Sequence, residues 1–329
     1  TCDGGAHNFD LYITNGNIAP VLIKCTTRCL NIDINVAQNI YPPKLISGFH
    51  FLAQEKEAAA ATLDKGGAIY IANLQNNDVS VNIEACIFEG FSVLIAGGAI
   101  YFENMAGIIN LRNLAFVHNY AQTSGGALYF ESSLQVILIQ ISFIQNSAKE
   151  GGAIAINSKA GIPSSLNISQ MISTGDTAEI QGGGIFIGRS SNLDITDSRF
   201  QNNSAPVGAA IAIQAARVNA VDLFVNGARD SSKFTASAIE CLAGSLVLES
   251  ARVSNTHGRG IQSTACLIFV HGSNFLHNNL PLGKGAGLLF LSNSEMEITS
   301  STFSSNIAVA VAKAKASSCS GVAPASCKW

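Results

Sequence analysis

The chain has few of the residues that would place it in several common classes of protein. Of its 329 residues only 7 are proline and 12% are charged, and the formal net charge is −3. This charge gives no basic surface that would attract nucleic acid or an anionic membrane, so we expect no nucleic-acid partner. No run approaches the roughly 20 apolar residues of a transmembrane helix. Because 47% of the residues are hydrophobic, the composition also excludes a disordered chain.

Cysteine is missing from the middle of the chain, since residues 87–240 contain none. No Cys-x-x-Cys pair occurs either, which argues against a zinc site. Cysteines gathered toward both ends predict end caps braced by disulfides in an oxidising compartment, with buried free thiols as the alternative. The candidate disulfide cysteines are Cys2, Cys25, Cys29, Cys86, Cys241, Cys266, Cys319 and Cys327.

Two further features favour a secreted or cell-surface protein. Asn167-Ile-Ser and Asn202-Asn-Ser are N-glycosylation sequons, so Asn167 and Asn202 are candidate glycosylation sites. The sequence begins at Thr1 without a basic and apolar leader, which favours a processed mature chain or a fragment of a longer one. We therefore expect an extracellular or cell-surface location.

Two short motifs alternate along most of the chain. Phe-x-x-Asn has full copies at Phe116, Phe143, Phe200, Phe275 and Phe303, and Met171 and Phe224 are expected at the same place in weaker coils. Irregular spacing between constant motifs indicates strands joined by variable turns. The other motif, Gly-Gly-Ala-(Ile/Leu), has clear or decayed copies that start 22 to 31 residues apart, at Gly66, Gly97, Gly125, Gly151, Gly182, Gly208, Ala236, Gly258 and Gly285.

These motifs predict an all-β fold, a right-handed parallel β-helix of the pectin-lyase-like kind. Before each Phe runs an alternating apolar segment, which is typical of a strand with one buried face. We expect about three strands in each coil and about ten coils in all. The Ile or Leu of the first motif should form one inward ladder and the Phe another, while the Asn should adopt left-handed turn geometry and bond along the stack. We expect an irregular N-terminal cap (1–65), the repeat helix (66–306) and a C-terminal cap or tail (307–329).

Together the two motifs resemble the repeat of the chlamydial polymorphic outer membrane protein family. The resemblance spans Gly66 to about Asn306 and covers a passenger-like region only. It implies a β-helix that is exposed outside the cell and associated with adhesion. Sequons and terminal cysteines would also suit a eukaryotic surface or filament protein built on the same repeat.

A search for catalytic groups finds no constellation, so we predict no catalytic residue, metal or cofactor. Asp194 and Asp197 lie three apart on an expected strand and should face opposite sides, whereas glycoside hydrolysis needs two carboxylates over one groove. Glu103 and Glu131 occupy matching places in adjacent coils but have no repeating Lys or Arg beside them, so we read them as solvated turn carboxylates. The histidines at positions 118, 257 and 277 are read as isolated or exposed turn residues.

One outward row of aromatic residues stands out as a candidate interface. If Ile100 points inward, Tyr101 points out, and the same alternation holds in the neighbouring coils. An exposed aromatic row marks a protein interface or a sugar-binding surface, unless a flanking loop covers it. The row consists of Tyr70, Tyr101, Tyr129 and Phe186.

The sequence therefore predicts a non-catalytic, extracellular structural or adhesive β-helix. Its expected partners are copies of itself, as in a surface appendage or filament, or other surface proteins and glycans. The alternative is a carbohydrate-active enzyme, a polysaccharide lyase or glycoside hydrolase, on the same scaffold. The two differ in what the outward face should present: converging charged groups in an enzyme, and small, polar or aromatic rows in a structural protein.

Overall fold

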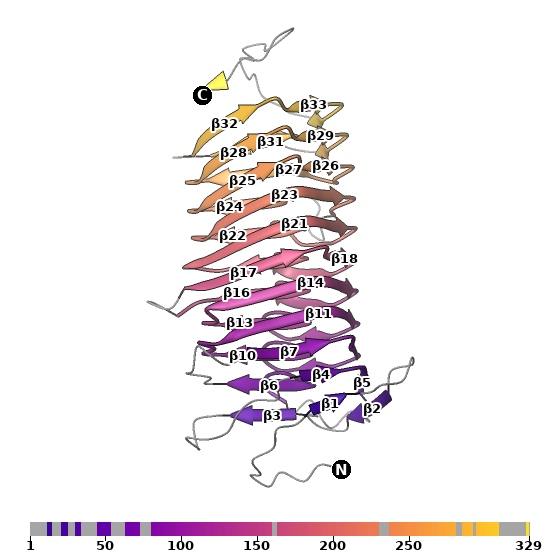
Figure 1. Ribbon diagram of the computed structural model, residues 1–329. Coiled ribbons are helices and arrows are strands. Elements are labelled where there is room, and N and C mark those ends of the chain that lie inside the picture. The colour runs from indigo at the N-terminus through magenta and orange to yellow at the C-terminus, as the bar shows by residue number, and fades with distance from the viewer. Residues whose placement is uncertain are drawn as a thin grey trace.

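The described residues build a rod of stacked β-strands (Figure 1). Almost all strand pairings are parallel, and the exception is β35 against β32. The predicted all-β solenoid is therefore confirmed. The computed structural model describes residues 12–14, 21–25, 30–33, 45–53, 63–72, 80–159, 163–229, 237–280, 285–291, 294–308 and 327–328.

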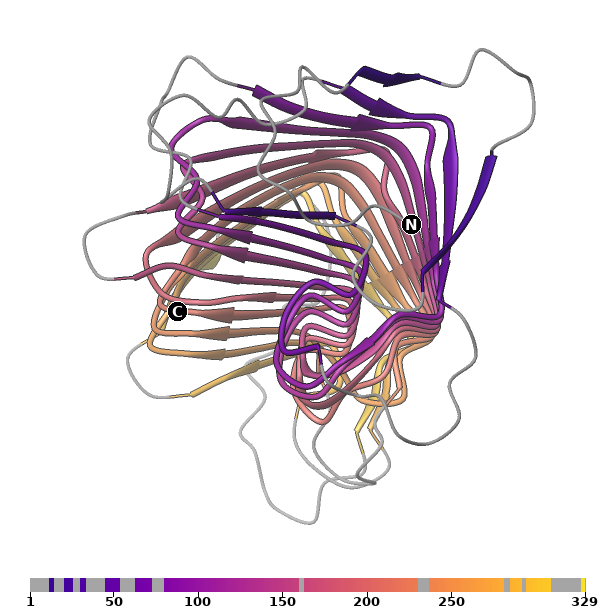
Figure 2. The ribbon, with the colours of Figure 1, turned by 90° about the horizontal axis from the view of Figure 1, so that it is seen from below.

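Seen along the rod, each coil turns through two large sheets and folds outward where a smaller one forms (Figure 2). The ten-stranded sheet holds β3 (Leu30–Asp33), β6 (Ile69–Ala72), β10 (Ile100–Glu103), β13 (Leu128–Glu131), β16 (Ile154–Asn157), β20 (Ile185–Ile187), β22 (Ile211–Gln214), β24 (Ser237–Leu242), β27 (Arg259–Thr264) and β31 (Leu288–Phe290). The four-stranded sheet holds β9 (Ser92–Val93), β12 (Tyr120–Ala121), β15 (Ser147–Glu150) and β19 (Thr177–Gln181). A pair joins β30 (Asn279–Leu280) to β34 (Ile307–Ala308).

The remaining strands form one sheet that wraps around a corner of the coil. The first half of its strands comprises β1 (Tyr12–Thr14), β2 (Val21–Cys25), β4 (Leu45–Ser47), β5 (Phe49–Ala53), β7 (Ser80–Glu84), β8 (Ile87–Glu89), β11 (Ile108–Val117), β14 (Gln135–Ile144) and β17 (Ser164–Ser169). The second half comprises β18 (Ile172–Thr174), β21 (Ser191–Gln201), β23 (Arg217–Asn226), β25 (Ser245–Glu249), β26 (Arg252–Ser254), β28 (Leu267–His271), β29 (Asn274–Leu276), β32 (Glu295–Thr299), β33 (Thr302–Ser304) and β35 (Cys327–Lys328).

The corner of this sheet is made by one left-handed residue per coil. In β11, β14, β21 and β23 it interrupts a single long strand, whereas elsewhere it separates two short strands. The short polar side chains at most of these positions tolerate the left-handed region better than β-branched ones do. In the four long strands the residues are Asn113 (φ 50°), Gln140 (57°), Asp197 (42°) and Asp222 (52°).

Two inward ladders fill the core where the motifs are complete. Phe224, expected in the Phe ladder, is in register with Arg199, and the buried Val225 takes the place beside Phe200. The Ile and Leu of Gly-Gly-Ala-(Ile/Leu) pair in register through the ten-stranded sheet, and Ile69 and Ile100 are completely buried. The Phe rings of the second motif stack face to face: Phe88 lies 5.1 Å from Phe116, which lies 5.1 Å from Phe143. Such stacks add to the stability gained by burying the rings.

The Asn residues of the second motif form an asparagine ladder, defined here by Asn119, Asn146, Asn203, Asn278 and Asn306. Its bonding along the stack is confirmed: Asn146 Oδ1 accepts from the backbone N–H and the Nδ2 of Asn119, both at 3.0 Å, and Asn146 Nδ2 donates to Phe116 O at 3.1 Å. The predicted backbone geometry is wrong by one residue. The left-handed residue is the one before each Asn, such as His118 (φ 53°), because the Asn itself points into the core.

The glycine pairs hold adjacent coils at close range. Gly125 has a φ of +65°, a conformation that disfavours residues with a Cβ. A Cβ on Gly126 would lie 2.0 Å from the carbonyl oxygen of Gly152 in the next coil. The first glycine of the motif therefore allows the chain to turn, and the second allows the backbone of the next coil to lie close to it.

Parallel pairing extends beyond the residues assigned to the repeat. Strands β3, β4 and β5 pair in parallel with β6, β7 and β8, so coils already stack before Gly66. At the other end, Cys327 and Lys328 of β35 pair antiparallel with Ile298 and Glu297 of β32. Within the described ranges, no helix has the length and hydropathy needed to cross a membrane.

Candidate functional site

The tyrosine row, here Tyr70, Tyr101 and Tyr129, lies on the outer side of the ten-stranded sheet. Its rings follow one another at 5.6 and 4.9 Å. The expectation that this row is exposed is wrong: Tyr101 is 2% exposed and Tyr129 is 9% exposed, and Phe186 further along is 5% exposed.

The cover comes from the segment that precedes each Gly-Gly pair. Figure 2 shows this part folding outward beside the ten-stranded sheet in the coils that carry β9, β12, β15 and β19. Ala96 of this segment belongs to the same apolar cluster as Tyr101, Tyr129 and Phe186. The aromatic rings are therefore a second, smaller core between two layers of the coil.

Charged groups close the open edge of the tyrosine row. Tyr70 Oη donates to Glu103 Oε2 at 2.8 Å, and the hydroxyl of Tyr101 donates to Glu131. Thus Tyr70 and Tyr101 each reach the glutamate of the following coil. The prediction that these two carboxylates are solvated is wrong, because the side chains of both glutamates are 17% exposed. No lysine repeats beside them, but one single lysine lies beside each.

Two lysines from outside the repeating positions supply the cations. Lys65 Nζ lies 2.9 Å from Glu103, and Lys159 Nζ lies 2.7 Å from Glu131 and 3.9 Å from Glu103. Lys65 also sits 4.6 Å above the ring of Tyr101. The sequence search missed these lysines because they stand at the ends of neighbouring segments and do not recur in the motif.

The electrostatics of this row do not prepare it for acid–base chemistry. Burial, with the neighbouring Glu131, raises the pKa of Tyr129 to about 12, and burial with the hydrogen bond to Glu131 raises the pKa of Tyr101 further. Burial alone would raise the pKa of Glu131, but hydrogen bonds from Lys159 and Tyr101 outweigh it and hold the pKa below its usual range. A general base or acid works best with a pKa near the working pH, and these shifts lead away from it.

A second polar group, which the sequence did not reveal, continues the line of the tyrosine row. Glu240 occupies the place after the inward Ile239 and is 8% exposed. It accepts from Ser237 Oγ at 2.7 Å and from Gln262 Nε2 at 2.9 Å. Burial raises its pKa to about 7, although those hydrogen bonds and nearby Arg259 partly offset the effect. The sequence did hold a signal for it: Glu240 follows the Ile of a decayed Gly-Gly-Ala-Ile motif, as Tyr101 follows the Ile of a complete one.

The other acids and histidines weighed in the sequence do not converge. Asp194 and Asp197 are both exposed, because the strand turns its corner at Asp197 and the assumed opposite faces do not apply there. His118 and His277 are exposed turn residues with a φ of 53°. His257 is exposed as well. Within the described ranges, no three His, Cys, Asp or Glu residues are grouped so as to hold a metal ion.

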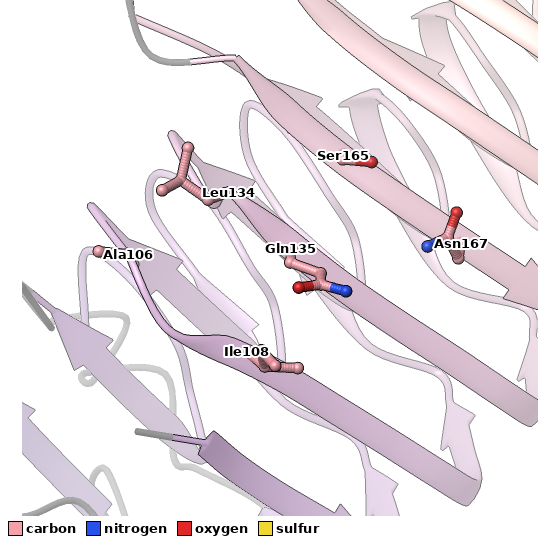
Figure 3. Close-up of a pocket in the computed structure, with 6 residues that line it drawn as sticks. All are labelled: Ala106, Ile108, Leu134, Gln135, Ser165 and Asn167. Atoms are coloured by element: carbon pink, nitrogen blue, oxygen red, sulfur yellow. The ribbon is translucent and has the colours of Figure 1, made fainter. Parts of the chain in front are cut away.

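A shallow hollow of about 360 Å³ lies at the start of strands β11, β14 and β17 (Figure 3). Its lining consists of three apolar residues, Ala106, Ile108 and Leu134, and three uncharged polar side chains beside them. These are Gln135, Ser165 and Asn167. Among the described residues, the lining thus combines apolar surface with amide and hydroxyl groups and carries no charge.

The cysteines are distributed differently from the predicted caps. A disulfide joins Cys241 to Cys266 in adjacent coils of the repeat region. Cys86 is a buried free thiol that donates toward Glu84 O at 3.1 Å, and burial raises its pKa to about 11. It therefore departs from the expected set of bridged residues and matches the alternative of a buried free thiol. Cys2, Cys29 and Cys319 lie outside the described residues, and Cys25 and Cys327 lie in strands described by their backbone alone.

The two sequon asparagines are both exposed. Asn167 projects from β17 beside the hollow (Figure 3), and Asn202 is the left-handed residue before Asn203 of the asparagine ladder. Their modification stays a prediction.

Comparisons with known proteins agree with this reading of the repeat. No curated protein matches the chain, and no solved structure does either. One family profile matches, over a segment that contains Phe143-Ile-Gln-Asn and Gly151-Gly-Ala-Ile. Residues 140–157 thus carry the Chlamydia polymorphic membrane protein repeat, as the resemblance predicted.

Proposed function

We propose that this chain is the exposed, adhesive β-helix of a surface protein and that it acts without catalysis. The observation that carries the proposal is the polymorphic membrane protein repeat at residues 140–157, set in a continuous stack of coils with the same motifs. A stack of this kind is compatible with a surface-displayed, adhesin-like passenger. The Cys241–Cys266 disulfide supports an oxidising, extracellular location.

The hollow at β11, β14 and β17 is the surface that we assign to adhesion. A neutral glycan fits its chemistry, because sugar hydroxyls hydrogen-bond to amides such as Gln135 and Asn167 while the C–H faces of the sugar pack on Leu134 and Ile108. The absence of charge in the lining disfavours a sulfated or uronic-acid ligand.

The test is a panel of neutral and acidic glycans, with binding measured for the wild-type chain and two matched variants. Leu134→Arg places a long charged side chain at the hollow, and Ile180→Arg makes the same change at another exposed position; the two residues are 37% and 50% exposed. We expect Leu134→Arg to weaken neutral-glycan binding at least about tenfold and Ile180→Arg to leave it unchanged.

Three results would contradict the proposal in different ways. Equal weakening of glycan binding by both variants would show that the hollow is not the binding surface. Binding of none of the glycans would refute glycan adhesion. Release of new reducing or unsaturated sugar ends during incubation would favour the alternative, a carbohydrate-active enzyme on a β-helix scaffold.

A further inference from the structure

In one coil a serine and an aspartate replace the two signature residues of the Phe-x-x-Asn motif. The strand register pairs Ser173 with Phe143 on one side and with Phe200 on the other, so a serine stands in the Phe stack. Three residues later, Asp176 takes the Asn place. The expectation that Met171 holds the Phe position is wrong by two residues: Met171 is also buried, but the strand register places Ser173 beside the Phe residues.

Asp176 is fully integrated into the asparagine ladder. Its Oδ1 accepts from the backbone N–H of Asn146 at 2.7 Å and from Asn146 Nδ2 at 2.9 Å. Its own N–H donates to Asn203 Oδ1 at 2.9 Å. The replacement of Asn by Asp therefore keeps the acceptor side of the ladder intact.

The serine and the aspartate are matched to each other. Ser173 Oγ donates to Asp176 Oδ2 at 2.7 Å and accepts from Asn203 Nδ2 at 2.8 Å. Both residues are completely buried. A phenylalanine at position 173 would leave Oδ2 without this donor, so the two replacements work as a pair.

The donor side of the ladder distinguishes the two protonation states. Elsewhere the Asn Nδ2 donates to a backbone carbonyl of the preceding coil, as Asn146 does to Phe116 O and Asn278 does to Val253 O. Oδ2 of Asp176 occupies the corresponding place. Protonated, it can donate a hydrogen bond as the amide does. Ionised, it has no proton to donate and stays buried as a charge, which is costly without a cation.

No such cation faces Asp176 among the described residues. Strands β14 and β18 carry no ionisable side chain, and the charged side chains of β15, β19 and β21 are exposed or partly exposed and form no ion pair with it. Burial raises the pKa of Asp176 to about 7, with hydrogen bonds from Ser173 and Asn146 offsetting part of the rise. The flanking charged residues are Lys149, Glu150, Glu179, Asp194, Asp197 and Arg199.

We propose that the coil containing Ser173 and Asp176 is a proton-dependent weak point of the rod, closed while Asp176 holds its proton and the first coil to open once it is ionised. In the unfolded chain the carboxyl has its ordinary pKa near 3.8, below the folded value. Stability is therefore greatest at acidic pH, is lost as pH rises from about 4 through about 7, and stays low above that. Because each coil contacts only its neighbours, the loss shows first as local opening.

Hydrogen exchange with mass spectrometry, corrected for the intrinsic pH dependence of exchange, tests this directly. We compare the opening equilibrium of peptides covering 164–181 with that of peptides covering 108–121, from pH 5 to pH 8, in the wild type and in Asp176→Asn. In the wild type we expect opening of 164–181 to rise at least tenfold over this range, while 108–121 changes far less. In Asp176→Asn, which restores the ladder amide, we expect the rise to disappear.

A second variant separates the aspartate from the serine. Ser173→Phe/Asp176→Asn rebuilds the whole motif, and we expect protection at 164–181 to become independent of pH and at least as high as in the wild type at pH 5. A rise of the same size in wild type and Asp176→Asn would overturn the proposal. So would a carbon-13 titration in which the Asp176 carboxyl ionises near pH 4 in the folded protein.

Discussion

Replacing Phe116 by alanine removes one ring from the middle of the Phe stack. Phe116 is fully buried and lies between Phe88 and Phe143, each 5.1 Å away. Truncation of a buried Phe costs about 3–5 kcal/mol when the cavity cannot collapse. Collapse is restricted here because both neighbouring rings belong to strands held in register by the coils above and below.

The same substitution at the end of the stack provides the matched control. Phe303 is 40% exposed and stacks on one ring, that of Phe275 at 4.7 Å. Phe303 is already partly in contact with solvent, and its truncation removes only the stacking contact with Phe275. We therefore expect Phe303→Ala to lower the free energy of unfolding by about 1 kcal/mol.

The measurement is denaturant unfolding of both variants, combined with hydrogen exchange to locate the change. We expect the loss in Phe116→Ala to exceed that in Phe303→Ala by at least about 2 kcal/mol and to appear as faster exchange in 80–145. Equal losses, or faster exchange spread evenly over all coils, would refute the argument that each ring is stabilised by its immediate neighbours.

The remaining predictions concern the tyrosine row and assembly. Tyr101→Phe removes the hydroxyl that donates to Glu131 and should lower the free energy of unfolding by about 1–2 kcal/mol; a change below about 0.5 kcal/mol would show that Lys159 alone satisfies this carboxylate. Head-to-tail polymerisation into a filament stays a prediction, although β35 already occupies an edge of β32. Filaments seen by electron microscopy of the non-reduced protein would support it, and a single monomer peak in size-exclusion chromatography at all concentrations would contradict it.

The inward half of the structure could be predicted because it repeats. Gly-Gly-Ala-(Ile/Leu) and Phe-x-x-Asn recur with recognisable residues in most coils despite their irregular spacing, and strand alternation then assigns their faces. Ile100 and Phe116 are buried where the motifs placed them.

The outward half could not be predicted because alternation says which way a side chain points but not what lies over it. Tyr101 does point away from the central core, but the residues that cover it come from a segment without a recurring signature. Asp176 was missed for a related reason: position 171 and position 173 have the same inward phase, so hydrophobicity alone favoured Met171. Aligning Asp176 with Asn146 and Asn203, at 30 and 27 residues, would have found it.

The in-register stacking of the coils also governs how such a rod can change in evolution. A side chain in one coil meets its counterpart in the next, and Gly126 leaves room for nothing but the backbone of the neighbouring coil. Removing a few residues from a strand would therefore break the alignment of that coil with the coils on either side. Duplicating or deleting an entire coil would leave each remaining contact with an equivalent partner. We therefore expect the length of the rod to change in evolution by whole repeats, and single-residue insertions to be tolerated only in the loops between strands.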